Sequence, residues 1–435
     1  MTARLSTPLA MLMLAGCVQS PRASAPAPAT ASAGQPATTA SGAPAALPDV
    51  SERAMRVYRE SIVIDMHNDM PSKVLDDGYD PDVRHPAGFG RTEGNTDLPR
   101  LMESGLTAEF MSAFVDAGYA FKTPDQSYAR VGLYLDTIAA FARKHPDKLI
   151  FSTTAEDVRR AKREGKVAIF IGVEGGHAIE NSLDKLRDLY RRGTRYMTLT
   201  WNNGNQWAGS SNGMNNTRKG GLTPFGRDVV HEMNRLGMLV DLSHVSDSTF
   251  FDAIAISTAP VIASHSSSRA LGLHPRNLSD DQLRAVARNG GVVNVNFYST
   301  FIDPTFAAAV EKGRAEFRPI RDSIIKAEGD NETTRRKVDD LAAARMAALP
   351  QTPLSVLIDH FDHIAKVAGV DHVGLGSDFD GVSALPIGME DVTRLPRIAQ
   401  RLLDRGYSES DVKKILGGNM LRVIERVLDG AATSH

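Results

Sequence analysis

The 435-residue chain has only one cysteine and almost no net charge. A single cysteine excludes an intrachain disulfide, and it excludes zinc or iron–sulfur sites built from several thiolates. With 50 Lys and Arg against 52 Asp and Glu, the formal net charge is −2, so no overall positive field attracts a nucleic acid. The sequence contains no local basic patch that would replace such a field. Any metal site must therefore use histidine and carboxylate ligands, and we expect no nucleic-acid partner.

The single cysteine, Cys17, ends a short apolar segment near the N-terminus. Residues 9–15 carry no charge, follow Arg4, and run into Leu14-Ala15-Gly16-Cys17, which has the form of an export signal. The run is much shorter than the roughly 20 residues that a membrane-spanning helix needs. Its small residues before cysteine resemble a bacterial lipoprotein signal. We therefore predict a signal peptide over residues 1–16 and lipid attachment at Cys17, with an ordinary secretory signal as the alternative.

The segment after Cys17 has the composition of a tether. Residues 18–48 are mostly Ala, Pro, Ser, Thr and Gly, and the first acidic residue of the chain is Asp49. Such a segment cannot bury a core, and its prolines keep it extended at up to about 3 Å per residue. We predict a lipidated tether over residues 17–48 and a folded domain over residues 49–435. The protein would then be exported and anchored to the bacterial cell envelope, facing the periplasm, and Val18 favours the outer membrane where one exists.

Eight short runs rich in β-branched residues alternate with longer helical segments. Residues 167–173 are apolar throughout, as expected for a parallel strand covered on both faces. This alternation predicts an α/β fold, a (β/α)8 TIM-like barrel in one domain, with two stacked three-layer domains as the alternative. No second linker divides the chain, which favours the barrel. The runs are 61–66, 107–115, 167–173, 194–200, 237–243, 260–264, 291–297 and 372–377, and the helical segments include 182–192, 225–236, 280–289 and 353–368.

Residues 301–350 form an unusually long connection between the seventh and eighth runs. The segment is rich in Arg, Glu, Lys and Ala, which predicts a helical insertion. Its composition leaves three interpretations open: a solvated helix pair, a lid, or an oligomer contact.

Histidine or carboxylate residues follow five of the eight predicted strands. Because the carboxyl ends of barrel strands meet at one rim, we expect these side chains around one cavity. Three carboxylates so close together would repel each other, and a pair of divalent cations would relieve the repulsion. The candidate residues are His67, Asp69, Glu174, His244, His265 and Asp378.

The spacing of these residues suggests how two ions could be shared. His67 and Asp69 are two apart on an extended segment, so both can reach one metal ion. Glu174 could bridge to a second ion held by His244 and His265. Nitrogen and oxygen ligands without thiolate suit Zn²⁺, although Mn²⁺ or Co²⁺ would fit the same set. We expect zinc.

Longer motifs surround these residues and span residues 63 to 426. They include His67-Asn68-Asp69-Met70-Pro71, Thr96-Asp97-Leu98-Pro99-Arg100-Leu101, Gly172-Val173-Glu174-Gly175-Gly176-His177, Arg195-Tyr196-Met197-Thr198-Leu199-Thr200, Asp241-Leu242-Ser243-His244, Ser264-His265-Ser266-Ser267, Arg276-Asn277 and Gly376-Ser377-Asp378-Phe379-Asp380-Gly381. Together these motifs resemble those of the membrane (renal-type) dipeptidases, which are dizinc (β/α)8-barrel peptidases. The chain is similar to a bacterial lipoprotein member of that family.

The resemblance implies two zinc ions and a role for each site residue. The five implied metal ligands are His67 and Asp69 on one ion, His244 and His265 on the other, and Glu174 bridging both. The implied nucleophile is a hydroxide between the two zinc ions, which Asp378 orients and whose proton it passes to the departing amine. Arg276 resembles the anchor for the substrate's terminal carboxylate, which a guanidinium can hold with two hydrogen bonds. Such an anchor selects dipeptides, and the resemblance implies that a D-residue at the carboxyl side is tolerated.

The chain departs from the family pattern at Trp201. Members of the family carry histidine after the Leu-Thr of the fourth strand, where this chain has Leu199-Thr200-Trp201-Asn202-Asn203. An indole donates one hydrogen bond and cannot become cationic, so Trp201, a neighbouring Asn or the metal ions alone must stabilise the oxyanion. We favour a substrate-contacting pocket wall as the role of Trp201. The disulfides of the mammalian enzymes cannot form here, so a homodimer would be held without them.

The sequence thus predicts a zinc-dependent dipeptidase, and two alternatives remain. One is a lipid-anchored dipeptide-binding protein with chemistry weakened at Trp201, against which the full ligand set and Asp378 argue. The other is a related metal hydrolase that acts on lactams or other carboxylate-bearing substrates, since a fold alone does not fix function. Arg276 favours a substrate with a free carboxylate. Asn296 and Tyr298 lie at the end of the seventh run and could touch the substrate.

Overall fold

The computed structural model describes residues 47–120, 126–214 and 220–430. The predicted signal peptide, Cys17 and nearly all of the predicted tether lie outside these residues. Among the residues that the structure describes, no helix combines the length and the apolar character that crossing a membrane requires.

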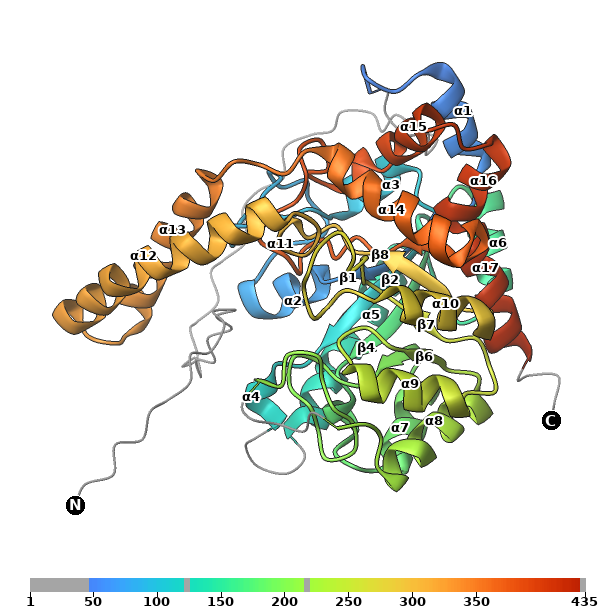
Figure 1. Ribbon diagram of the computed structural model, residues 1–435, viewed down its shortest axis with the longest axis horizontal. Coiled ribbons are helices and arrows are strands. Elements are labelled where there is room, and N and C mark those ends of the chain that lie inside the picture. The colour runs from blue at the N-terminus through green and yellow to red at the C-terminus, as the bar shows by residue number, and fades with distance from the viewer. Residues whose placement is uncertain (1–46, 121–125, 215–219, 431–435) are drawn as a thin grey trace, which may run out of the picture.

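Eight parallel strands close into a barrel (Figure 1). The ring runs β1 (Ile64–Asn68), β2 (Ala108–Phe114), β4 (Val167–Glu174), β5 (Thr194–Thr198), β6 (Leu239–Asp241), β7 (Ile262–Ala263), β8 (Val292–Val295) and β9 (Val373–Leu375). It closes where Asp65 of β1 pairs with Leu375 of β9. Each of the eight predicted runs overlaps one of these strands, so the predicted barrel is confirmed and the two-domain alternative is wrong.

A ninth strand, β3 (Leu149–Phe151), was not predicted. It pairs with the first residues of β4, on the side where β5 pairs with the later residues. Because β2 pairs directly with β4 along its whole length, the barrel closes without β3.

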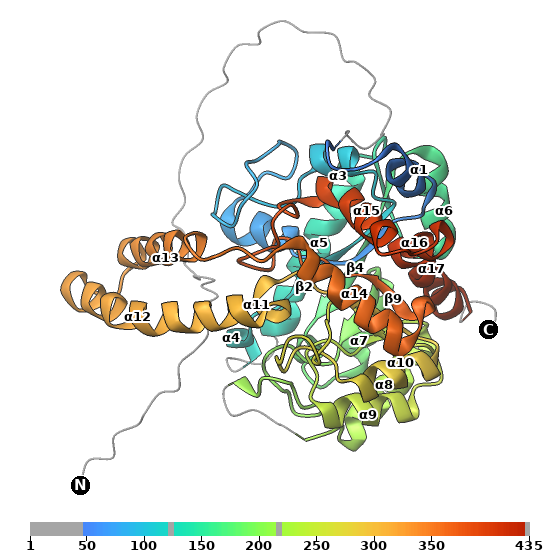
Figure 2. The ribbon, with the colours of Figure 1, turned by 45° about the horizontal axis from the view of Figure 1, so that its top comes forward.

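Helices surround the barrel and cover its outer wall (Figures 1 and 2). The four helices predicted above match α7, α8, α10 and α14 to within two residues at each end. The helices are α1 (Glu52–Glu60), α2 (Met70–Ser72), α3 (Leu98–Ser104), α4 (Ala117–Ala120), α5 (Gln126–Lys144), α6 (Ala155–Glu164), α7 (Leu183–Arg191), α8 (Pro224–Leu236), α9 (Asp247–Ile256), α10 (Asp280–Asn289), α11 (Ser299–Ile302), α12 (Pro304–Glu328), α13 (Glu332–Ala347), α14 (Leu354–Ala368), α15 (Pro396–Asp404), α16 (Glu409–Lys413) and α17 (Asn419–Ile424).

Aromatic side chains fill the barrel beneath the carboxyl ends of its strands. The ring of Phe110 lies between those of Phe170 and Tyr196, with centroids 4.6 and 5.6 Å away. Tyr196 fits there because position 172 is glycine, since a Cβ on Gly172 would lie 1.9 Å from the tyrosine ring. The packed interior makes the barrel a solid support, and the Tyr196 hydroxyl reaches His67 at the rim, 2.8 Å from Nδ1.

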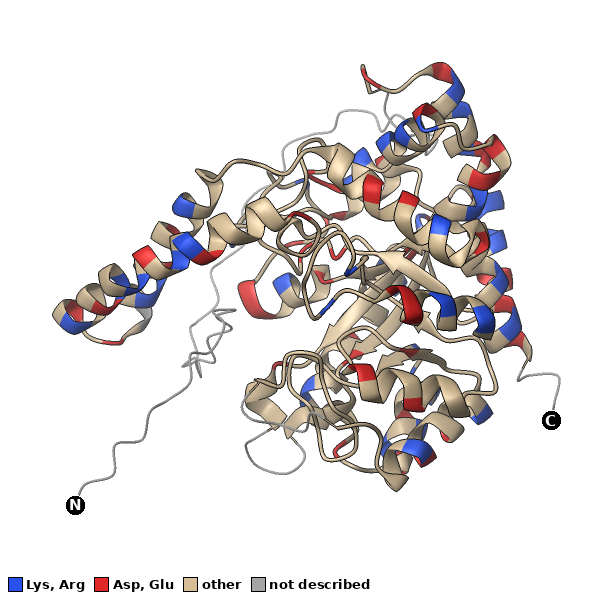
Figure 3. Cartoon of the chain, in the orientation of Figure 1, with Lys and Arg blue, Asp and Glu red and all other residues tan. Residues whose placement is uncertain are grey.

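The predicted insertion is a helical hairpin between β8 and β9. Helices α12 and α13 project away from the barrel (Figure 2), and acidic and basic residues are interspersed along them (Figure 3). At the base of the hairpin, Phe306 and Val310 pack against Tyr298 and Ala384. The hairpin is thus joined to the segments that follow β8 and β9, both of which border the site described next.

Candidate metal centre and catalytic site

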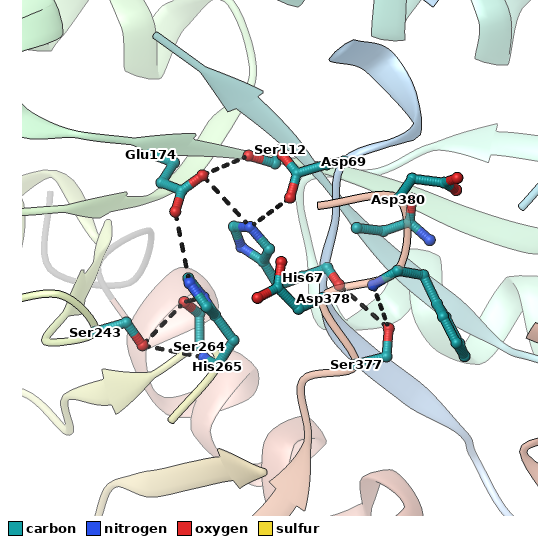
Figure 4. A network of polar contacts seen from close by, with 12 residues as sticks. His67, Asp69, Ser112, Glu174, Ser243, Ser264, His265, Ser377, Asp378 and Asp380 are labelled. Carbon is teal, nitrogen blue, oxygen red and sulfur yellow. Dashed lines mark hydrogen bonds and ion pairs between the residues drawn. The ribbon is translucent and has the colours of Figure 1, made fainter. Parts of the chain in front are cut away.

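Side chains from five barrel strands converge at the rim (Figure 4). All six candidate residues are buried and come from the carboxyl ends of β1, β4, β6, β7 and β9, as the sequence predicts. They are His67 on β1, Asp69 just after it, Glu174 at the end of β4, His244 after β6, His265 after β7 and Asp378 after β9.

Glu174 lies at the centre of the cluster. Its Oε1 is 2.8 Å from His244 Nε2 and 3.5 Å from His265 Nε2, while its Oε2 is 3.5 Å from His67 Nε2. The same His67 nitrogen is 3.1 Å from Asp69 Oδ2. The carboxylate thus has one histidine–carboxylate pair on one side and two histidines on the other.

The outer nitrogen of each imidazole is held by a polar partner. His244 Nδ1 donates to Asn202 Oδ1 at 3.2 Å, and the same oxygen also accepts from the amide of Asn212. His265 Nδ1 donates to Ser264 Oγ at 2.8 Å, because the serine hydroxyl is itself donated to Asp241 Oδ2 at 2.6 Å. The inner nitrogens, Nε2 of both histidines, therefore carry lone pairs rather than hydrogens.

Two lone pairs facing each other require a cation between or beside them. The Nε2 atoms of His244 and His265 are 3.0 Å apart, and both face the carboxylate of Glu174. In addition, Asp69 Oδ1 is buried without a hydrogen-bond partner among the described residues. Glu174 accepts one long hydrogen bond, from the Ser112 hydroxyl to Oε2 at 3.4 Å, and such a group of acceptors is costly to bury unless a metal ion binds it. The donor set of imidazole nitrogens and carboxylate oxygens fits zinc and similar divalent ions.

The partners of the imidazoles are functional residues that sequence reasoning missed. Tyr196, Asn202, Ser264 and Asp241 fix the ring orientation of the three histidines, and such outer partners tune metal affinity. The available signal was weak: Ser264 precedes a ligand directly, whereas Tyr196 and Asp241 lie on strands and become neighbours only through barrel closure.

The backbone at two site residues has left-handed geometry. His244 and Asp378 have φ angles of 67° and 63°, a region that costs a non-glycine residue free energy. Next to them, Gly381 leaves room for two carboxylates, because a Cβ there would lie 2.2 Å from Asp69 Oδ2 and 2.4 Å from Asp378 Oδ1. The segment after β9 therefore accepts local strain at Asp378, and Gly381 leaves space for this carboxylate beside that of Asp69.

Asp378 is suited to carry a proton near neutral pH. Burial raises the pKa of its carboxyl group to about 7. One of its oxygens, Oδ2, accepts a hydrogen bond from Asn296 Nδ2 at 2.8 Å. The side chain lies beside His67 in Figure 4, within reach of the same centre. A carboxyl group that titrates near 7 can act as both acid and base.

Arg276 is a buried cation without a carboxylate partner among the described residues. Its side chain is almost completely buried, and Nη2 donates to the carbonyl of His265 at 3.2 Å. Within the part of the chain that the structure describes, its Nε has no hydrogen-bond partner. Burial lowers the pKa of the guanidinium only to about 10, so it stays charged at neutral pH. An unpaired buried guanidinium beside the metal cluster fits an anionic part of a ligand.

Trp201 lies at the edge of the cluster and makes packing contacts. Its ring meets Phe114 edge to face with centroids 4.8 Å apart, and it is 6.4 Å from the ring of His244.

His177, close by in sequence to Glu174, donates from Nε2 to the carbonyl of Val115, and burial lowers its pKa to about 4. His177 is thus a neutral structural residue.

The other polar neighbours shape the backbone around the ligands. Asp65 accepts from the backbone N–H of Ser377, and Asn68 accepts from that of Met70. Asp380 accepts from the backbone N–H of Asn95 at 2.8 Å. These contacts tie β1 to the segment after β9 and hold the loop around residue 95 against it.

A closed barrel with buried histidines and carboxylates at its carboxyl-terminal rim defines a metal-dependent hydrolase. The family model of the membrane dipeptidases (peptidase family M19) matches residues 51–435, and the chain belongs to this family. It is a metallodipeptidase, as the sequence predicts.

Solved structures agree with this assignment. The probable dipeptidase PvdM from Pseudomonas aeruginosa is 26% identical with a TM-score of 0.74, and the match covers 87% of this chain and 98% of that one. A metallopeptidase of family M19 named dipeptidase AC is 26% identical with a TM-score of 0.66, over 85% and 99%. A metallopeptidase from Rhodobacter sphaeroides, bound to a phosphinate mimic of the dipeptide L-Ala-D-Ala, is 25% identical with a TM-score of 0.66, over 85% and 100%.

Proposed function

We propose that the protein is a lipid-anchored dizinc dipeptidase that cleaves dipeptides with L-L or L-D configuration. The observation that carries the dizinc assignment is the arrangement around Glu174, with His67 and Asp69 on one side and His244 and His265 on the other. Zinc is the ion we favour for this set, because its ligands are imidazole nitrogens and carboxylate oxygens without thiolate.

Each remaining site residue has a role that its surroundings support. When bound, two zinc ions supply Lewis acidity and lower the pKa of a shared water. Asp378 holds the proton taken from the attacking water and gives it to the departing amine, for which a pKa of about 7 is well suited. Trp201 and Phe114 form an aromatic wall that contacts the substrate's side chain.

Arg276 would set the length of the substrate. A guanidinium buried beside His265 can bind the terminal carboxylate, so the scissile bond must lie one residue away from that end. The Rhodobacter sphaeroides relative, which holds an L-Ala-D-Ala mimic, supports a dipeptide whose second residue can have D configuration. The proposed reaction is therefore hydrolysis of the single peptide bond of a dipeptide.

The proposed test measures metal and turnover together. Full-length protein purified in detergent should contain about two zinc ions per chain and release amino acids from a panel of L-L and L-D dipeptides. A chelator should abolish release, and added zinc should restore it. Full zinc content with no turnover on any dipeptide would favour the dipeptide-binding protein instead. Protein that binds no zinc would refute the ligand assignment.

The proposed anchor rests on the N-terminal sequence. Lipidation of Cys17 after removal of residues 1–16, followed by a tether to residue 48, would hold the domain at the cell envelope. Labelling of cells with a radioactive fatty acid should mark the wild-type protein and leave C17S unmarked. Equal labelling of the two proteins would exclude this cysteine as the attachment point.

A further inference from the structure

We propose that Asn296 is a positioning residue that fixes the carboxylate of Asp378 and reserves one of its oxygens, Oδ1, for proton transfer. The inference rests on the proposed role of Asp378 as the proton carrier. It concerns which atom holds the proton and what keeps that atom in place.

Three hydrogen bonds fix the position of Asn296. It directly follows β8, is fully buried, and its backbone carbonyl accepts from the Ser267 hydroxyl at 3.0 Å. Its side-chain Oδ1 accepts from the backbone N–H of Tyr298 at 2.6 Å. With its oxygen held in this way, the amide group has one orientation, and its Nδ2 must point at Asp378 Oδ2, 2.8 Å away.

Asp378 is held from the opposite side by its own backbone. Its N–H donates to the carbonyl of His67 at 3.1 Å, and its carbonyl accepts from the N–H of Gly381 at 3.2 Å. The carboxylate can therefore move mainly by rotation of its terminal torsion, which would exchange its two oxygens. Among the described residues, Asn296 makes the only hydrogen bond to the side chain of Asp378. This hydrogen bond therefore opposes the rotation.

The two oxygens of Asp378 have different surroundings. Oδ2 already accepts an amide hydrogen, which disfavours a proton on it. Oδ1 faces the space that Gly381 leaves open, which Asp69 Oδ2 also borders. Oδ1 is therefore the oxygen that takes a proton from the attacking water as the new C–O bond forms. The same oxygen returns the proton to the amine nitrogen as the C–N bond breaks.

Loss of the amide should affect turnover rather than substrate binding. Without it, the carboxylate rotates between two orientations, and proton transfer requires alignment within a narrow range. Asn296 has no hydrogen bond to Arg276 or to the five proposed metal ligands, so terminal-carboxylate binding and zinc content should not change. The expected signature is a lower kcat with an unaltered KM.

The matched control lies two residues earlier on β8. Asn294 is also fully buried, and its amide donates to the carbonyl of Ala263 at 2.9 Å, away from Asp378. N296A should lower kcat roughly 10- to 100-fold, with KM within about twofold and zinc content unchanged. N296D, which keeps the shape but loses the donor, should be at least as slow. N294A should keep the kcat of the wild type even where it lowers stability.

Three results would overturn the inference. These are an unchanged kcat in N296A, a raised KM at constant kcat, and an equal loss of kcat in N294A. Loss of zinc from N296A would also overturn the inference, because Asn296 would then serve to hold the metal site.

A crystal structure of zinc-loaded N296A separates this inference from the proposed function. The Asp378 carboxylate should be rotated or present in two orientations, and an unchanged carboxylate refutes the inference even if the wild type cleaves no dipeptide. Absence of wild-type turnover alone refutes only the proposed function.

Discussion

Asp241 is a buried carboxylate that lies behind a proposed metal ligand. It accepts hydrogen bonds from the hydroxyls of Thr198 and Ser264 and from two backbone N–H groups, and Ser264 in turn accepts from His265. This chain of hydrogen bonds fixes the tautomer of His265 and raises its basicity as a ligand.

We expect D241N to weaken zinc binding. An amide in place of the carboxylate supplies a donor where the Ser264 hydroxyl now donates, so His265 loses its fixed tautomer. Zinc affinity, measured by competition with a chromogenic chelator, should fall about 10- to 100-fold. D247N is the control. It removes the ion pair between Asp247, the first residue of α9, and Arg269, and it should bind zinc like the wild type. Equal affinities in D241N and wild type would contradict the role of Asp241.

His360 makes stability depend on pH. Its Nε2 donates to the carbonyl of Ile302, and its Nδ1 accepts from the backbone N–H of Ser268, so the buried ring must be neutral. Burial lowers its pKa to about 4. Since the unfolded chain binds this proton at about pH 6.5, the stabilisation is complete above pH 6.5 and is lost as pH falls towards 4.

The expected loss is about 3 kcal/mol of unfolding free energy between pH 7 and pH 4. The loss should appear as a steeper dependence of the unfolding free energy on pH in the wild type than in H360Q. The amide of the glutamine can donate and accept a hydrogen bond but does not titrate. Urea unfolding at several pH values measures the difference, and other titrating groups contribute equally to both proteins. Parallel pH dependences for the two proteins would show that His360 is not responsible.

The residue-level predictions from sequence succeed where chemistry and strand ends coincide. His67, Glu174 and His265 each directly follow a predicted strand run, and the pattern places them at one rim before any contact is known. The partners that orient them, such as Asn202 and Asp241, are ordinary polar residues in sequence. Their roles depend on which strands become neighbours, and a local pattern does not carry that information.

At the scale of elements, strands and helices follow from local physical signals. Buried parallel strands such as β4 are apolar up to the last residue, here Glu174, and α10 begins at a capping box formed by Ser279 and Gln282. The strand β3 was not predicted, and it pairs only with the start of β4. Its existence depends on tertiary pairing rather than on its own pattern.

The α12–α13 hairpin should depend on a few residues at its base. Phe306 is fully buried against Tyr298 and Val310, whereas Ile320 further along α12 is 44% exposed. We expect F306A to destabilise the protein by about 3 kcal/mol, through lost burial and the cavity left behind. The exposed control I320A should change stability by less than about 0.5 kcal/mol. Urea unfolding of both variants provides the comparison, and equal midpoints would show that the base does not hold the hairpin.

At the scale of the whole molecule, the sequence predicts one barrel because the strand–helix alternation continues without a second linker. The direction in which the hairpin projects was not predictable, since its charged composition fits several arrangements. Closure of the ring between β9 and β1 was implied by the strand count alone. Closure brings Asp378, the proposed proton carrier, to the proposed metal ligand His67, and the site therefore depends on the complete fold.

The proposed metal ligands join segments that are far apart in sequence, so metal removal should lower global stability. The proposed ligands come from four strands, β1, β4, β6 and β7, and meet around Glu174; a metal that binds only the folded chain stabilises it by RT ln(1 + [L]/Kd). At a metal concentration of about 100 to 1,000 times Kd, this amounts to roughly 3 to 4 kcal/mol. Wild-type protein should therefore unfold at a lower urea concentration after chelation. E174Q should lose most of the difference because its amide is a poor bridging ligand, whereas E232Q should keep it, since Glu232 is a buried residue of α8 that pairs with Arg187 and Arg235 rather than with the metal ligands. A chelator effect as large in E174Q as in the wild type would place the stabilising metal elsewhere in the molecule.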